Sequence, residues 1–331
     1  MMRLSRLGLA AVFAATLAAV TAPGARAAEA DKLLPAESDT VVYVNFKQIV
    51  EADVVKKYAI DQIKQALAGQ DAKKLLEDMG LDPMKDIEKV WVGMSGSGED
   101  TKALVVIHGK FEPEKLFKAA EATTKKDGDK FSMVKDGNTT MFKYQPEQGN
   151  PVYGTVANET TVIAATDKKI IATALKAAEG TKKAPIKPEL TELIKGFDEK
   201  TTSMFAVALV KGKFENQKLG GGMLPIDLSG LEKSLPKTDT MSVVVKVSAD
   251  INLEIVLGMA DEDAAEDMAG AIAKLIKDLG AFVPALVAFE PKAKPLGDVI
   301  KTVTSDTKKK NVTIKGKITG DIIGKLMNPD G

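Results

Sequence analysis

Few residue types in this chain could perform acid–base or nucleophilic chemistry. The 331 residues contain no cysteine and one histidine, His108, which follows the apolar run 104–107 in a segment typical of a β-strand. A histidine triad, a multi-histidine zinc site and a cysteine nucleophile therefore lack the residues to build them within one chain. We expect His108 to be a hydrogen-bonded strand residue rather than a catalytic group.

The densest group of carboxylates is the acidic segment 261–267. It opens a stretch with helical apolar spacing, and Lys274 and Lys277 follow toward the end of that stretch, which is the charge order that a helix dipole favours. The spacing and central glycine of an EF-hand loop are absent. We expect a helix start and no metal site. A hydrolase that uses carboxylates stays open, although no general acid can be named among the scattered acidic residues.

Two glycine-rich segments resemble phosphate loops at first sight. Residues 95–98, Ser-Gly-Ser-Gly, lie between two predicted strands and open no helix, so they indicate a hairpin turn. Gly220–Gly222 is followed by Met-Leu-Pro and not by the Gly-Lys-Ser/Thr of a nucleotide-binding loop. This segment indicates a surface loop, with a functional lid as the alternative. No cofactor is expected.

The charges are balanced, with 46 basic and 46 acidic residues, so the basic excess of a nucleic-acid-binding protein is absent. The arginines are Arg3, Arg6 and Arg26, and every later basic residue apart from His108 is a lysine. Lysine lacks the bidentate fork with which arginine recognises phosphates and carboxylates. An enzyme that grips phosphate is therefore disfavoured.

Residues 1–27 have the pattern of a secretory signal peptide. Arg3 and Arg6 precede the apolar run 7–22, and residues 25–27, Ala-Arg-Ala, match a cleavage site, so we expect cleavage between Ala27 and Ala28. Cleavage after Ala30 is the alternative. A retained membrane anchor is disfavoured, because the run is shorter than the roughly 20 residues that span a bilayer. The protein is expected in the periplasm, the cell envelope or outside the cell, with no transmembrane anchor after signal removal and no disulfide.

The later periodicity predicts an α+β fold. Strand, helix, hairpin, helix, further strands and a terminal helix occur in residues 28–180 and again in 188–331, which indicates an internal duplication around a linker at 181–187. Apolar and polar residues alternate in 251–255 and 312–315, as in strands with one buried and one solvated face. We therefore expect two similar antiparallel sheets, each with helices on one face.

An apolar run, 281–289, follows the long helix predicted over 261–279. Because Pro284 interrupts it, we expect an irregular stretch that reaches Pro295. The run either packs in the core or forms an apolar patch in which Phe282, Leu286 and Phe289 meet a lipid or a protein partner.

The segment Leu33–Asn45, Leu-Leu-Pro-Ala-Glu-Ser-Asp-Thr-Val-Val-Tyr-Val-Asn, resembles the start of exported proteins of unknown function from planctomycete-type bacteria. The resemblance implies an envelope or extracellular address and no known activity. Three hypotheses follow for function. The first is a non-enzymatic cell-envelope protein that acts by binding, the second is a periplasmic carrier of a lipid or other apolar ligand, and the third is the hydrolase.

Overall fold

The computed structural model describes residues 28–67, 76–77, 79–126, 128–147, 149–180, 186–215, 217–219 and 226–327. The chain divides between Ala206 and Val207 into two compact units, here called the N-terminal unit and the C-terminal unit. The signal peptide predicted over 1–27, the glycine segment 220–222 and most of the predicted linker 181–187 lie outside the described residues.

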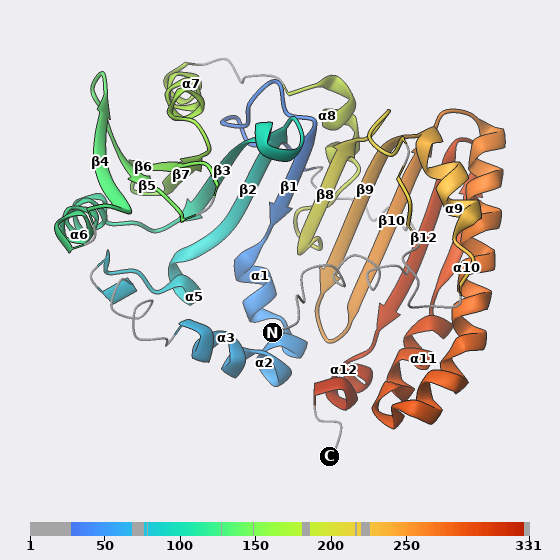
Figure 1. The fold of residues 1–331 in the computed structure, drawn as a ribbon. Helices are drawn as coiled ribbons and strands as arrows, with labels where there is room; N and C mark the ends of the chain where they lie inside the picture. The colour runs from blue at the N-terminus through green and yellow to red at the C-terminus, as the bar shows by residue number, and fades with distance from the viewer. Residues whose placement is uncertain are drawn as a thin grey trace. The chain divides into compact units, whose positions relative to one another are not determined.

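Residues 28–180 of the N-terminal unit have the predicted order of strand, helix, hairpin, helix, further strands and terminal helix (Figure 1). The helix that follows over residues 188–195 was not predicted. The strands of the unit are β1 (Thr40–Val44), β2 (Ile87–Ser95), β3 (Lys102–Gly109), β4 (Phe131–Asp136), β5 (Thr139–Tyr144), β6 (Val152–Asn158) and β7 (Thr161–Ala165). Its helices are α1 (Phe46–Glu51), α2 (Asp53–Tyr58), α3 (Ile60–Leu67), α5 (Pro83–Asp86), α6 (Pro113–Lys126), α7 (Lys168–Glu179) and α8 (Pro188–Lys195). The strands pair antiparallel in the order β1-β2-β3-β7-β6-β5-β4.

An aromatic cluster fills the core of this unit. Tyr43 of β1 and Trp91 of β2 are cross-strand neighbours with ring centroids 4.7 Å apart, and Phe205 stacks on Tyr43 at 5.1 Å. Phe197 extends the cluster, 4.5 Å from Phe205. Tyr43, Trp91 and Phe205 are almost completely buried. Such large side chains contribute about 1.5–3 kcal/mol each when fully buried, so this cluster anchors β1 and β2.

The segment that precedes β1 packs onto β2 at Gly93. A Cβ atom at Gly93 would lie 2.8 Å from Ser38 Oγ, 3.0 Å from Pro35 Cδ and 3.2 Å from Leu34 Cδ2, so only glycine allows this approach. Leu34 is completely buried as a result. The Leu-Pro segment that the sequence analysis singled out is therefore part of the core.

Side chains pack on both faces of the sheet at β5. Met141 is buried on one face, and the adjacent Phe142 meets Phe117 of α6 with ring centroids 5.6 Å apart. Successive strand residues point to opposite faces. The face that carries Phe142 is therefore covered by α6, which also packs against β4 and β6.

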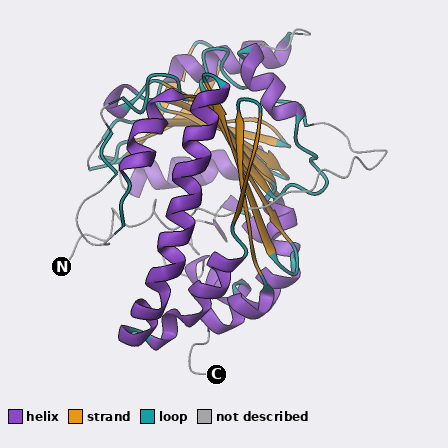
Figure 2. Ribbon diagram, turned by 90° about the vertical axis from the view of Figure 1, so that its right-hand side faces the viewer, coloured by secondary structure: helices purple, strands orange, loops and turns teal. Residues whose placement is uncertain are grey.

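The C-terminal unit contains the longest helix described. Its strands are β8 (Met204–Leu209, which begins in the N-terminal unit), β9 (Thr238–Val247), β10 (Ile251–Met259), β11 (Thr304–Lys308) and β12 (Asn311–Ile318). Its helices are α9 (Ser229–Ser234), α10 (Glu262–Phe289), α11 (Lys294–Lys301) and α12 (Gly320–Met327), with short 3-10 turns at Leu235–Lys237 and Pro291–Ala293. Figure 2 shows α10 running as one continuous helix alongside the strands of this unit.

The core of the C-terminal unit lies between α10 and the sheet. Alternate residues of β10 and β12 face buried residues in the first half of α10, as the alternation predicted. The cluster contains Ile255, Leu257, Val312, Ile314, Ala264, Ala265, Met268 and Ile272. Among the described residues, no helix combines the length and the apolar character that a membrane crossing requires.

The described strands form one antiparallel sheet in the order β11-β12-β10-β9-β8-β1-β2-β3-β7-β6-β5-β4. The prediction of two separate sheets is therefore wrong. In two separate sheets, β1 and β8 would each be an edge strand with a row of unpaired backbone groups, and adjacency in one sheet removes both edges. The division of the chain at Ala206 also lies C-terminal to the predicted linker.

Candidate functional site

The apolar run 281–289 is helical and is part of α10, which ends at Phe289. The predicted irregular stretch is therefore wrong up to that residue, because α10 continues through Pro284. Phe282 and Leu286 are half-buried, whereas Phe289 is 91% exposed. Spacings of four and three residues put these three side chains on the same side of the helix. These are the three residues for which the sequence left open an apolar patch or packing in the core.

Burial along α10 is uneven. Its buried residues are Ala264, Ala265, Met268 and Ile272, all in the first half. The apolar side continues through Leu275, Leu279 and the predicted patch, but none of these later residues is buried. The first half of α10 therefore holds the helix on the sheet, and the second half presents an apolar side that the chain covers incompletely.

Neighbouring helices contribute further exposed apolar groups. Leu296 of α11 is 41% exposed, and Leu326 and Met327 of α12 are 39% and 44% exposed. Helix α11 packs against both α10 and α12, and all three end in the same lower part of Figure 1. With Phe289, these residues make up four of the seven exposed large hydrophobic residues among those described. We call these four residues the apolar tip.

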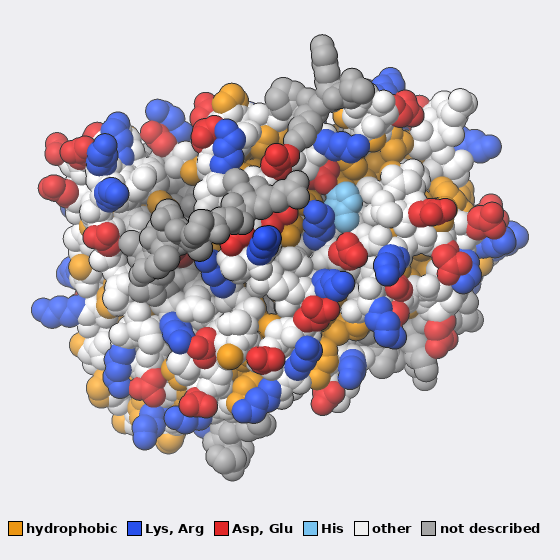
Figure 3. Space-filling view, turned by 180° about the vertical axis from the view of Figure 1, so that it is seen from behind, with side chains coloured by type: hydrophobic (Ala, Val, Ile, Leu, Met, Phe, Trp, Pro, Cys, Tyr) orange, Lys and Arg blue, Asp and Glu red, His pale blue; other side chains and the backbone are white. Residues whose placement is uncertain are grey.

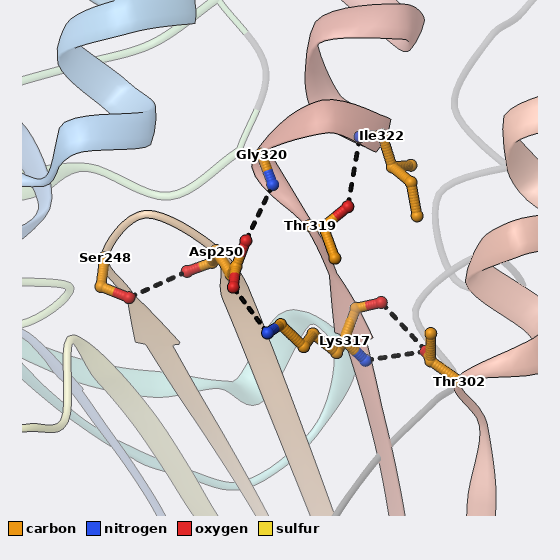
Figure 4. Close-up of polar contacts among 7 residues, drawn as sticks. All are labelled: Ser248, Asp250, Thr302, Lys317, Thr319, Gly320 and Ile322. Carbon is orange, nitrogen blue, oxygen red and sulfur yellow. Dashed lines mark hydrogen bonds and ion pairs between the residues drawn. The ribbon is translucent and has the colours of Figure 1, made fainter.

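A polar network links α11 and α12 to Asp250 and to the end of β12 (Figure 4). Asp250 accepts hydrogen bonds from the Gly320 amide at 2.9 Å and from Lys317 Nζ at 2.6 Å, and Lys317 is the largest cause that lowers the pKa of Asp250. Thr302, directly after α11, donates to the Lys317 carbonyl and accepts from the Lys317 amide, both at 2.9 Å. These bonds fix the start of α12 and the end of α11 to the end of β12.

Val283 lies on the side of α10 that packs against α11. A Cβ atom at Gly297 of α11 would lie 2.8 Å from the Val283 side chain, so the two helices are in close contact there. Val283 lies next to Phe282 in sequence and about 100° further around the helix. The contact with α11 is therefore on the side of Val283, whereas Phe289 is 91% exposed.

The single histidine is held by a carboxylate. His108 Nε2 lies 2.5 Å from Asp31 Oδ2, and Thr161 Oγ1 lies 3.4 Å from His108 Nδ1. Burial raises the pKa of Asp31, but the hydrogen bonds from His108 and the Leu33 amide, with the nearby charges, outweigh it and leave that pKa below 3.8. Figure 3 shows the imidazole, in pale blue, at the molecular surface.

A carboxylate, an imidazole and a hydroxyl in a row resemble a nucleophilic triad, but the geometry differs. The 3.4 Å separation from Thr161 is long for a hydrogen bond to the imidazole, and Thr161 is only 6% exposed. Asp31 instead ties the segment before β1 to β3. The prediction that His108 is a hydrogen-bonded strand residue is confirmed.

Lys315 is a feature that the sequence analysis missed. The alternation in β12 places this lysine on the solvated face, yet its side chain is only 1% exposed and its ammonium has no hydrogen-bond partner. Burial lowers its pKa. The alternation of apolar and polar residues does not predict the burial of Lys315. It assigns the residue to a face of the sheet but does not indicate what covers that face.

The remaining sequence candidates have structural roles. Asp261 accepts a 2.7 Å hydrogen bond from the Ala264 amide and caps α10, as expected for the acidic segment. Gly96 and Gly98 have positive φ angles in the turn between β2 and β3. Within the described residues no group of three or more histidine, aspartate or glutamate side chains could hold a metal ion. Ala27 lies outside the described residues, and Ala28 is buried.

Comparisons with known proteins give no family. No family model and no curated protein matches the chain. Among solved structures, crystal form III of TP0453 matches with 9% identity and a TM-score of 0.49, covering 90% of this chain and 97% of that chain. Crystal form IV matches with 8% identity and a TM-score of 0.47, covering 91% and 96% respectively. Neither likeness carries an inference about function.

Proposed function

We propose that this chain is an exported, non-enzymatic protein that binds a lipid or another apolar ligand through the second half of α10 and the apolar tip. The observation that carries the proposal is the 91% exposure of Phe289 at the end of the incompletely covered side of α10. A fully exposed phenylalanine forgoes about 1.5–3 kcal/mol of burial free energy, which a bound apolar partner would recover.

The chemistry of the site supports binding rather than catalysis. Its side chains are phenylalanine, leucine and methionine, which supply apolar contact area but no proton or nucleophile. The export part of the proposal is supported by the signal-peptide pattern in residues 1–27, and the resemblance of Leu33–Asn45 favours an envelope address.

Native mass spectrometry of the chain purified gently from an exporting host tests the proposal. We expect an apolar adduct on the wild-type chain, and an at least tenfold lower bound fraction in F289D and L286D. Ala288→Asp is the matched control, because Ala288 is exposed on the far side of the same turn. It adds the same charge near the same helix end and should keep the adduct.

Two outcomes would contradict the proposal. One is a wild-type chain that is bare and also takes up no added phospholipid from vesicles. The other is an adduct that F289D, L286D and A288D all retain equally.

We also propose that the two halves arose by duplication. In each half a first strand is followed by an antiparallel hairpin and a helix, and the last strand of the half pairs with the second strand of that hairpin: β7 with β3, and β12 with β10. Superposition of the two halves in an experimental structure tests this. The proposal requires β1-β2-β3-β7 to superpose on β8-β9-β10-β12 with the same strand directions.

A further inference from the structure

Lys315 lies in the middle of the strand that joins β10 to β11. The register puts it opposite Glu254 of β10 and Thr304 of β11. Its neighbours in sequence, Ile314 and Gly316, belong to the other face of the sheet, where Ile314 packs in the core against α10. Lys315 is therefore on the sheet face that α10 does not cover.

The ammonium of Lys315 is enclosed without an acceptor. The residue is 1% exposed, and Nζ has no hydrogen-bond partner. Burying an unpaired ammonium is costly, because the lost hydration is not replaced. Burial accordingly lowers the pKa of Lys315, while the charges of Glu254 and Asp306 oppose that lowering. These two carboxylates favour the charged form, yet neither supplies a bond to it.

The surroundings of Lys315 on this face are partly apolar. Val244 of β9 is opposite Glu254, and Val256 of β10 is opposite Thr313 of β12. Both valines point to the same face as Lys315, because the paired positions share a face.

We propose that Lys315 binds the oxyanion, a carboxylate or a phosphate, of an amphiphilic ligand whose apolar chain lies along Val244 and Val256. A buried cation without an acceptor next to apolar side chains is complementary to an anionic head followed by a hydrocarbon chain. The site is independent of the apolar tip, since it lies on the opposite face of the sheet from α10.

Isothermal titration with three twelve-carbon probes, each kept below its micelle concentration or its solubility limit, tests this assignment. The probes are dodecanoate, dodecyl phosphate and dodecanol, which share the chain and differ in the head. We expect one equivalent of at least one anionic probe to bind, and dodecanol to bind at least tenfold more weakly. Comparison of dodecanoate with dodecyl phosphate identifies which oxyanion the site takes.

Variants separate the site from general surface charge. K315M should lose at least tenfold in affinity for the anionic probe. K246M is the matched control, because Lys246 is an exposed lysine of β9 in the same unit, and it should bind like the wild type. F289D should also bind like the wild type, so failure of the apolar-tip proposal would leave this result unchanged.

The unfolding temperatures of the ligand-free wild type and K315M provide a second measurement for this test. Because K315M removes an unpaired buried charge and keeps most of the volume, we expect it to unfold at a higher temperature than the wild type. Equal binding of dodecanol, unchanged affinity in K315M, or no binding of either anion would each overturn the proposal. A lowered unfolding temperature in both K315M and E254Q would assign Lys315 to an internal pair with Glu254 instead.

Discussion

Asp31 and Lys315 are two largely buried charged residues that differ in their hydrogen-bond partners. Asp31 accepts bonds from His108 and from the Leu33 amide, so its charge is compensated and its pKa falls below 3.8. Lys315 has no acceptor, and burial lowers its pKa, which is the direction that disfavours its charge. Hydrogen bonds therefore mark Asp31 as structural, and the missing acceptor marks Lys315 as a candidate for ligand binding.

The Asp31–His108 pair should stabilise the fold in a pH-dependent way. We expect D31N to lower the free energy of unfolding by about 1–3 kcal/mol near neutral pH, as for a hydrogen bond to a charged group. The folded-state pKa of Asp31 is below its unfolded value, so its contribution is present above pH 3.8 and disappears as the pH falls through the folded-state pKa. Urea denaturation of wild type and D31N across this range measures the difference.

A double-mutant cycle with H108Q controls this prediction. If the pair accounts for the effect, D31N should cost little in the H108Q background. A D31N cost that is equal in both backgrounds, or that persists unchanged into acid, would show that Asp31 acts through the Leu33 amide alone.

At the scale of elements, α10 shows what local sequence rules miss. Pro284 predicts a helix end, because proline removes one backbone hydrogen bond and clashes with the preceding turn. The helix continues to Phe289, with Val283 packed against α11 at Gly297. Pro284 itself is exposed, so water can satisfy the carbonyl that it leaves unpaired. Tertiary packing beside the proline thus overrides the local signal.

Replacing this proline should stabilise the chain. An interior proline is about 3 kcal/mol less favourable than alanine in a helix, so we expect P284A to raise the free energy of unfolding by about 1–3 kcal/mol. Pro188→Ala is the matched control, because Pro188 is exposed in the first turn of α8, where proline costs little. Guanidinium denaturation of the three proteins measures the difference. Equal shifts in P284A and P188A would mean that α10 is not strained at Pro284.

Most of the helices and strands could be predicted from the sequence, whereas the joining of the strands into one sheet could not. Alternation in 251–255 and 312–315 correctly predicted strands with one core face. The helical apolar spacing after 261–267 predicted a helix, whose buried side includes Met268 and Ile272. The single sheet was not predictable, because adjacency of β1 and β8 depends on pairing between residues some 160 positions apart. The apolar run that contains Phe282, Leu286 and Phe289 was visible in the sequence, but its helical form required the structure.

At the scale of the whole molecule, the first residues after the predicted cleavage site are tied to the core of the N-terminal unit. Ala28 is completely buried, and its amide donates a 2.9 Å hydrogen bond to the Phe197 carbonyl. Phe197 belongs to the aromatic cluster with Phe205. The residues directly after the predicted cleavage site therefore contribute to folding, which distinguishes the two cleavage sites that the sequence leaves open.

Cleavage between Ala27 and Ala28 keeps this contact, because the new amino group can still donate to the Phe197 carbonyl. Cleavage after Ala30 would remove the bond and the buried methyl group of Ala28, at a cost of about 1–2 kcal/mol for one hydrogen bond and one small apolar group.

We expect intact-mass measurement of the exported protein to give a chain that begins at Ala28. A chain prepared to begin at Asp31 should then show a lower free energy of unfolding in urea. Equal stability of the two chains would show that residues 28–30 add nothing to the fold, and an exported chain that begins only at Asp31 would contradict the predicted cleavage site.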